Sequence, residues 1–266
     1  MRPQTKQPLT VQEQYLRKHK SHHRQVSFLR FFLLGIFLLL WEVSADLDWI
    51  DSFFFSSPHR VILCLGELWT ERSLPMHIGI TLSETILSFL LVFFVSLLLS
   101  TLLWFSRQLS EILEPYLVLL NSLPKSALAP ILIVWLGNNI KTIIVAAISV
   151  AVFGCIMTLH TGFMQTDPDK IKLIYSLGGT KKDVLTKVLL PGSVPLIISN
   201  MKVNIGLCLV GVIIGEFLAA NKGLGYLIIY GSQVFKMDLV VMSIVILCIV
   251  SAILYQGITV LEKRMK

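Results

Sequence analysis

Six long apolar runs constrain this chain more than any other feature of its sequence. They lie at residues 26–45, 80–105, 112–136, 140–163, 194–217 and 239–261. A bilayer core about 30 Å thick is crossed by a helix of about 20 mainly apolar residues. Charged residues make up only 15% of the chain, against about 25% in soluble domains. The sequence therefore predicts an all-α polytopic membrane protein with about six transmembrane helices.

The lysines and arginines are divided unevenly between the two sides that six spans define. Of the 23, sixteen are assigned to the side of the two termini and five to the opposite side, counting those at the ends of runs, while Lys125 and Lys202 lie well inside runs. Cytoplasmic segments carry an excess of Lys and Arg, so both termini are expected in the cytoplasm. The same rule explains the basic N-terminal tail, and no nucleic-acid partner is expected. The first run is interpreted as a retained anchor and not as a cleaved signal peptide. Aspartates follow it, and the small-residue pattern of a cleavage site does not.

The spans and their connections predict five segments. They are a basic cytoplasmic tail that is expected to be poorly ordered (1–25), a first transmembrane anchor (26–45), an outer interfacial segment (46–79), a transmembrane domain containing the polar loop 165–191 (80–262), and a cytoplasmic C-terminus (263–266). In the interfacial segment, Ser57-Pro58 is a favourable helix start. Either that helix lies in the membrane interface, or the segment is a connector whose aromatic side chains sit at the headgroups.

The polar loop between the fourth and fifth runs carries the signals of two short helices. Asp167 is an N-cap candidate and precedes a proline at the first helical position. Gly178 or Gly179 supplies the left-handed residue that ends the first helix. Thr180 and Asp183 resemble a capping box that starts the second helix, which Pro191 is expected to end. The predicted unit is a pair of amphipathic helices on the cytoplasmic side, which either rests on the inner leaflet or binds a partner.

Polar residues interrupt the third and fifth runs. Asn121 and Lys125 occur with two prolines in the third run, and Asn200 and Asn204 occur in the fifth. Ionisable and amide side chains inside a membrane are candidates for a solute path. Alternatively, Lys125 extends to the headgroups, and the asparagines make hydrogen bonds between packed helices. Glu216 is expected at the outer boundary of the fifth run, where a charge is tolerated.

No catalytic or metal site is expected. The four cysteines have no paired spacing, three of them fall inside runs, and they are interpreted as small apolar residues of the helix interiors. No nucleophile–base pair and no metal-ligand cluster are apparent.

The polar loop resembles the cytoplasmic signature of ABC importer permeases. Gly178 is followed after nine residues by Val188-Leu189-Leu190-Pro191, and Ser176-Leu177-Gly178 is similar to the usual Ser-Leu-Gly. The Glu-Ala-Ala opening of that signature is replaced by Lys172-Leu173-Ile174. The segments 123–137 and 215–226 are similar to the nitrate/sulfonate/taurine-type branch. The resemblance covers roughly residues 50–262.

The resemblance implies how such a chain works. The loop would dock on a separate ATP-binding cassette ATPase through residues Lys172, Ser176, Leu177, Gly178, Gly179, Lys182 and Pro191. The chain has no phosphate-binding loop of its own, so it is expected to be a transport subunit without enzymatic activity or cofactor. Its further partners would be the lipid bilayer, an extracytoplasmic solute-binding protein and a second, identical permease subunit in a bacterial plasma membrane.

Two other functions remain compatible with the residues. A partner-independent secondary carrier or channel would transport without an ATPase, although no inverted repeat is obvious. A membrane anchor for a cytoplasmic complex would not transport at all. For an importer of this branch, the expected solute is a small anion such as nitrate, a sulfonate or taurine, or a vitamin-like heterocycle.

Overall fold

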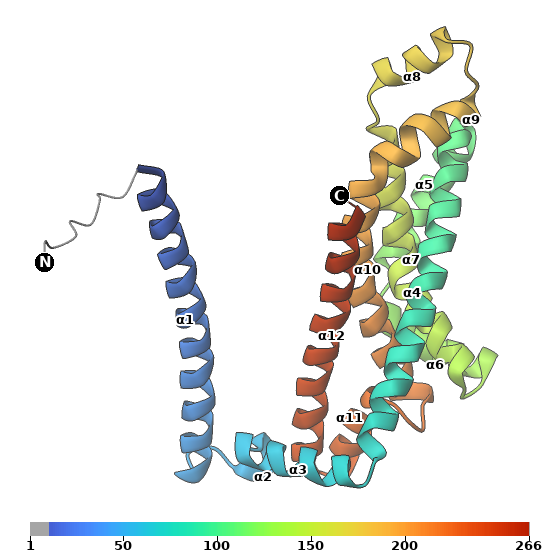
Figure 1. Cartoon of the computed structure of the whole chain (residues 1–266). Coiled ribbons are helices and arrows are strands. Elements are labelled where there is room, and N and C mark those ends of the chain that lie inside the picture. Colours follow the sequence, from blue (N-terminus) through green and yellow to red (C-terminus); the bar gives the residue numbers. More distant parts are fainter. Residues whose placement is uncertain (1–10, 266) are drawn as a thin grey trace, which may run out of the picture. The chain divides into compact units, whose positions relative to one another are not determined.

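The computed structural model describes residues 11–265, which form helices joined by short connections (Figure 1). Five of these helices are long and apolar enough to cross a membrane, and one bent helix pair makes a sixth candidate. The helices are α1 (Val11–Asp46), α4 (Ser73–Phe105), α7 (Ile140–Met164), α10 (Leu190–Ala219) and α12 (Met237–Met265), and the bent pair is α5 (Arg107–Ser122) with α6 (Lys125–Leu136). The predicted fold class is confirmed, and the five or six candidate spans agree with the predicted number of about six.

The chain divides into two compact units, Met1–Ile62 and Leu63–Lys266. In the first unit, α1 is followed by the short α2 (Ser52–Phe55) and by the start of α3 (Pro58–Thr70). A Glu42 carboxylate oxygen accepts the backbone N–H of His59 at 2.9 Å, which satisfies a free donor in the first turn of α3. Residues 11–25 of the predicted tail are part of α1, which begins at Val11, and residues 1–10 lie outside the described residues.

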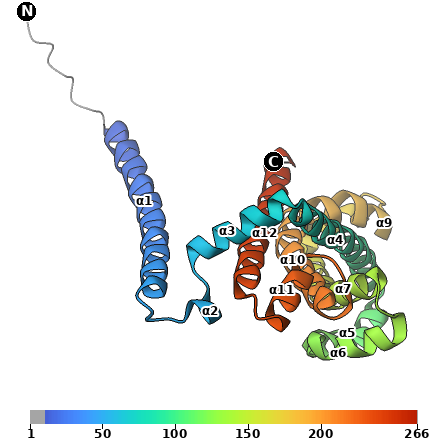
Figure 2. The ribbon, with the colours of Figure 1, turned by 90° about the horizontal axis from the view of Figure 1, so that it is seen from below.

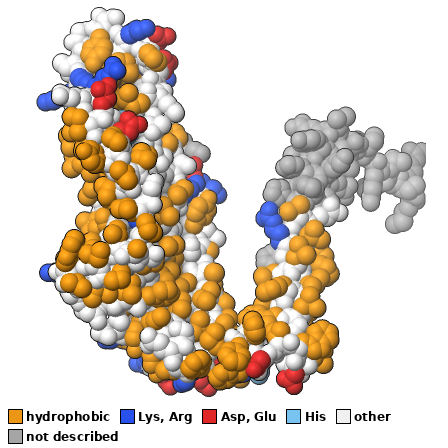
Figure 3. Space-filling model, turned by 180° about the vertical axis from the view of Figure 1, so that it is seen from behind, with side chains coloured by type: hydrophobic (Ala, Val, Ile, Leu, Met, Phe, Trp, Pro, Cys, Tyr) orange, Lys and Arg blue, Asp and Glu red, His pale blue; other side chains and the backbone are white. Residues whose placement is uncertain are grey.

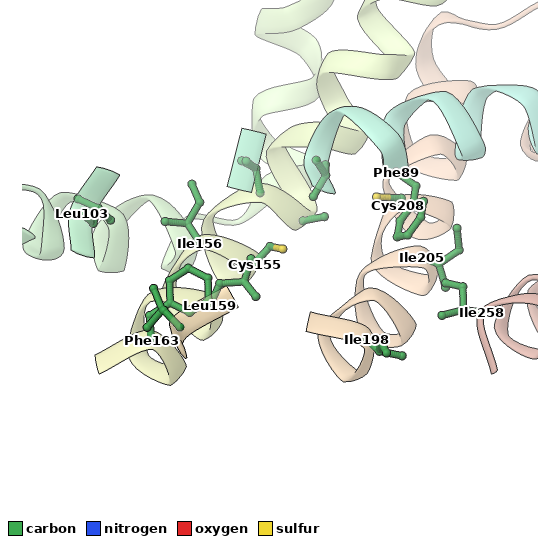
Figure 4. Packing of buried hydrophobic residues seen from close by; sticks show 14 residues of the cluster. Phe89, Leu103, Cys155, Ile156, Leu159, Phe163, Ile198, Ile205, Cys208 and Ile258 are labelled. Carbon is green, nitrogen blue, oxygen red and sulfur yellow. The ribbon is translucent and has the colours of Figure 1, made fainter. Parts of the chain in front are cut away.

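The core of the second unit lies between α4, α7 and α10. Phe163 of α7 and Cys208 of α10 are fully buried there, together with Leu159 and Ile205 (Figure 4). Two serines of α4 donate hydrogen bonds to carbonyls of α7, and the better of the two joins Ser100 Oγ to Ile156 O at 3.0 Å. Small side chains and interhelical hydrogen bonds of this kind hold helices together in lipid, where burial of apolar area gives little driving force.

The third span is broken. Its halves, α5 and α6, meet at an angle of 87°, because Pro124 cannot continue the hydrogen-bonding pattern of α5. Both halves contact α7, and Figure 2 shows them on one side of the bundle. The prediction of an irregular third span is confirmed.

The two ends of the second unit carry different short helices. The loop between α7 and α10 contains α8 (Pro168–Ser176) and α9 (Lys181–Val184) at one end. At the opposite end, α11 (Leu224–Gln233) lies between α10 and α12. Hydrophobic side chains cover much of the surface between the ends, and charged side chains gather mostly near them (Figure 3). This distribution suits a protein whose sides face lipid and whose ends face water.

Candidate functional site

The α7–α10 loop, residues 165–191, is shaped by hydrogen bonds within itself. The Asp167 side chain caps α8 by accepting the N–H of Asp169 at 2.9 Å. At the other end of α8, Gly178 has φ +78° and its N–H bonds to Tyr175 O, while Gly179 N–H bonds to Ile174 O. These two bonds are the Schellman ending of a helix, which needs a left-handed residue such as glycine.

The capping box of the second helix is also present. Asp183 accepts the N–H of Thr180 at 2.8 Å, and the Thr180 hydroxyl accepts the N–H of Asp183. The predicted caps and the left-handed glycine are therefore confirmed. Lys187 pairs with Asp183 at 2.9 Å, which adds a contact within one helical turn.

The prediction that Pro191 ends the second helix is wrong. Between α9 and α10 the chain forms one π-helical turn, Leu185–Leu189, in which Leu190 N–H donates to Leu185 O. A proline lacks the N–H that would bond to the fourth residue before it, and its ring clashes with that residue's carbonyl. The wider π-turn accommodates the ring, so Pro191 lies in the first turn of α10 and the helix continues.

The residues predicted to contact an ATPase lie on both sides of the glycine turn. Lys172 is exposed and pairs with Asp169 at 3.3 Å, and Ser176 donates to Lys172 O at 3.0 Å. Leu177 is 76% exposed at the turn itself. Lys182 is exposed as well. These residues are thus exposed in the loop at one end of the bundle, and their role in docking stays a prediction.

Three features of this surface were missed from the sequence. Leu173 and Tyr175 are 59% and 48% exposed, although they alternate with the polar residues of α8. Lys181 extends to the end of α4, where its Nζ donates to Phe105 O at 2.8 Å. Leu173 and Tyr175 are two positions apart in α8, so they do not share one face of the helix and a helical wheel does not single them out. No local signal identifies the Lys181 contact across 76 residues.

The polar residues of the broken span make local contacts. Lys125 Nζ donates to Leu120 O at 2.7 Å and to Asn121 O, so the ammonium group caps the last carbonyls of α5. The Asn121 amide lies against α7, since its Oδ1 would be 3.3 Å from a Cβ placed on Gly154. Lys125 therefore stabilises the bend in the third span.

Asn200 and Asn204 are buried together between α10 and α7. Asn204 Nδ2 donates to Asn200 Oδ1 at 2.8 Å, and Asn200 Nδ2 donates to Cys155 Sγ at 3.0 Å. Asn204 Oδ1 has no protein partner, and the two amides border a cavity of about 10 Å³, which is roughly the space of one water molecule. Asn121 and Asn200 thus touch neighbouring residues of α7, but a shared solute path through them stays a prediction.

The opposite end of the bundle holds a buried polar cluster. Glu216 of α10 is 0% exposed and Glu84 of α4 is 3% exposed, and the two carboxyl groups are neighbours, although Glu84 Oε2 has no hydrogen-bond partner among the described residues. A buried carboxylate is costly unless it is paired and hydrogen-bonded. The expectation that a charge at Glu216 is easily tolerated is therefore wrong, because the side chain is buried within the bundle although it lies near the end of α10.

This Glu84–Glu216 cluster fixes the turn that leads into α11. The Thr81 hydroxyl donates to Glu216 Oε1 at 2.6 Å and accepts the N–H of Leu224 at 2.8 Å. Glu216 Oε2 accepts the N–H of Gly225 at 2.5 Å, as an N-cap side chain would. His77 Nδ1 lies 2.9 Å from Gly223 N, which is consistent with a hydrogen bond that Gly223 donates.

The cluster could have been found from one sequence signal. His77, Thr81 and Glu84 follow each other at intervals of four and three residues, which places them on one face of α4. Three polar residues on one face of an otherwise apolar span need polar partners.

Comparison with known proteins places this geometry in a family. Residues 92–266 match the family described as "Binding-protein-dependent transport system inner membrane component". A "Probable ABC transporter permease protein" of Haemophilus influenzae is 30% identical over 87% of this chain and 94% of its own length. The "Formylaminopyrimidine transport permease protein ThiX" of Halalkalibacterium halodurans is 26% identical over 74% of this chain and 77% of its own. The "Taurine transport system permease protein TauC" of Escherichia coli is 25% identical over 87% and 86%.

The fold has a counterpart among solved structures. A chain of the inward-facing MetNI methionine ABC transporter superposes with a TM-score of 0.65 at 18% identity, covering 74% of this chain and 98% of that chain. This likeness concerns the fold alone. Because the family match spans well over half of the sequence, the chain belongs to the binding-protein-dependent transport system inner membrane components, the permease subunits of ABC importers.

Proposed function

We propose that this permease forms the membrane path of an importer driven by a separate ATPase subunit, which docks on the α7–α10 loop. One observation supports the loop as the docking surface. Leu173, Tyr175 and Leu177 expose 59%, 48% and 76% of their surface on a loop that also carries exposed charged residues such as Lys172 and Lys182. Large apolar side chains grouped on a polar surface mark sites of protein–protein contact. Leu173 stands within the positions of the acidic opening of the family signature, and Tyr175 and Leu177 follow it before Gly178.

The docking contact would be made chiefly by shape and apolar area. Lys172 replaces the glutamate of the signature and is held by Asp169 at 3.3 Å. An ATPase groove that fits this loop would place apolar side chains against Leu173 and Leu177, and an acidic group near Lys172 or Lys182. Charge complementarity of this kind selects the right partner more than it adds affinity.

The assembly would contain two copies of the permease, and a solute-binding protein on the side opposite the loop. Both termini and the loop would lie in the cytoplasm of a bacterial cell, as the distribution of lysine and arginine indicates. ATP would be consumed by the partner, and no cofactor is assigned to this chain. The solute would be small, an anion such as taurine, nitrate or a sulfonate, or a heterocycle such as formylaminopyrimidine, since relatives are named for these.

The docking proposal is tested by purification of the permease with its ATPase. Leu177→Asp places a charge in the centre of the apolar surface, and Gly178→Asp alters the turn beside it. Both variants are expected to insert in the membrane but to retain less than about a tenth of the bound ATPase. The control is Glu71→Ala, which replaces an exposed side chain far in sequence from the α7–α10 loop. Normal ATPase binding by both loop variants, or solute uptake in proteoliposomes without any ATPase, would overturn the proposal.

A further inference from the structure

Lys181 occupies an unusual position for a cation. It is in the first turn of α9, where the helix dipole disfavours positive charge. Its ammonium group is directed at a different helix. Nζ donates to Phe105 O at 2.8 Å and lies 5.3 Å from the centre of the Trp104 ring and 5.7 Å from that of Phe105.

The end of α4 is a suitable acceptor for this cation. Phe105 is the last residue of α4, so its carbonyl has no partner within the helix. The C-terminal end of a helix attracts positive charge, and the two aromatic faces add cation–π attraction. Three independent interactions therefore hold one side chain of the loop on the end of α4.

The loop is thereby joined to two long helices. It continues through the π-turn into α10 by the chain itself, where Val184 and Leu189 are fully buried. It reaches α4 through Lys181. At their other end, α4 and α10 are fastened by Thr81, Glu84 and Glu216. A helix of 33 residues is about 50 Å long, so α4 spans the distance between the loop and the turn that begins α11.

We propose that Lys181 is a positioning residue for transport, which fastens α9 to α4 so that a movement of the α7–α10 loop displaces α4 and α10 together. This inference rests on the proposed function, in which an ATPase moves the loop. Without the contact, the loop would still bind the ATPase but would act on α10 alone. The turn before α11, which α4 and α10 hold jointly, would then no longer follow the loop.

The main experiment compares Lys181→Met, which keeps the apolar stem but removes the cation, with Lys181→Arg, which keeps a donor and a cation. Lys263→Ala removes an exposed lysine elsewhere and is the matched control. The permease–ATPase complex is reconstituted with the binding protein, and uptake per ATP hydrolysed is measured for taurine, nitrate and formylaminopyrimidine. The Lys181→Met complex is expected to bind the ATPase and to hydrolyse ATP as wild type does. Its solute uptake per ATP hydrolysed is expected to be at least about fivefold lower, which is the lower end of typical coupling free energies between two sites. Lys181→Arg and Lys263→Ala are expected to keep the ratio.

A second measurement does not depend on the solute. Spin labels at Leu102 and Thr186, in a variant without the native cysteines, report the distance between the end of α4 and the loop. Wild type is expected to give one narrow distribution of label-to-label distances, both with and without vanadate-trapped nucleotide. Lys181→Met is expected to give a broad or altered distribution. Trp104→Leu, which removes one ring, is expected to act in the same direction and to add little to Lys181→Met.

The outcomes separate this inference from the proposed function. If Lys181→Met keeps the wild-type distance and uptake ratio while Gly178→Asp loses ATPase binding, only the role of Lys181 is overturned. A parallel fall of bound ATPase, hydrolysis and uptake in Lys181→Met would show a structural role and would also overturn it. If Gly178→Asp and Leu177→Asp bind the ATPase normally, the docking proposal itself has failed.

Discussion

Replacement of Glu216 by alanine is expected to destabilise the permease more than most single substitutions. The side chain accepts hydrogen bonds from Thr81 Oγ1 at 2.6 Å and from Gly225 N at 2.5 Å, and it contacts Glu84. All of these groups are buried. Glu216→Ala would therefore leave a hydroxyl, an amide and a carboxyl group without their partner.

The expected magnitude follows from the number of groups that lose a partner. An unsatisfied buried polar group costs about 1–3 kcal/mol, so three of them cost at least about 3 kcal/mol before relaxation. Glu216→Gln keeps one of the two acceptor oxygens, so it loses one of the hydrogen bonds from Thr81 and Gly225. Its expected cost is about 1 kcal/mol. In soluble domains of similar size 1 kcal/mol lowers Tm by about 2–4 °C, which suggests falls of roughly 6–12 °C for alanine and 2–4 °C for glutamine.

The assay is the fraction of detergent-solubilised protein that stays monodisperse after heating, at one fixed heating rate because unfolding is expected to be irreversible. Glu71→Ala, an exposed glutamate, controls for the loss of a carboxylate as such. An alanine variant within about 2 °C of wild type would refute the reasoning. So would a glutamine variant as unstable as the alanine variant, because the loss would then follow from charge rather than from hydrogen bonds.

Three further predictions concern other contacts. Gly178→Val forces a β-branched residue to φ +78°, at a cost of about 1–3 kcal/mol. The valine variant should therefore co-purify with less ATPase than wild type, whereas Gly178→Asn should co-purify with as much. Gly211→Leu introduces a side chain whose Cβ would lie 2.5 Å from Ala147 Cα. Because α7 and α10 would have to separate, the yield of folded protein should fall severalfold. An unchanged yield would contradict the close crossing of the two helices. Lys202→Met removes the largely buried ion pair between Lys202 and Glu262, at about 1–3 kcal/mol. The double variant with Glu262→Leu should recover stability, and additive losses would show that the pair does not act as a unit.

Local signals predicted the spans and most of the α7–α10 loop. An apolar run of sufficient length is enough to predict a membrane-spanning helix, because each apolar residue favours insertion into lipid regardless of which residues it contacts in the fold. The caps of the loop were predictable for a related reason, since Asp167, Gly178 and Thr180 bond to residues at most five positions away. Their geometry is set by the chain itself and needs no information from the rest of the fold.

The features that were missed depend on distant parts of the chain. Glu216 was expected at a boundary because its own run ends there, but its burial is caused by α4, which is 135 residues away at Thr81. Lys181 was visible only as a cation in an unfavourable turn, and its partner lies 76 residues earlier. The error at Pro191 was of another kind. Proline was taken as a stop, whereas a π-turn lets the helix accommodate it.

The self-contained caps of the α7–α10 loop have a consequence for binding kinetics and for engineering. The loop holds its shape through Asp167, Thr180, Asp183 and the Gly178–Gly179 turn, so it has little disorder to lose when a partner arrives. Association should then be fast and nearly rigid. Because the loop holds its own shape, it could be grafted onto another permease without loss of its structure. Moved into the equivalent position of another permease, it should carry its choice of ATPase with it.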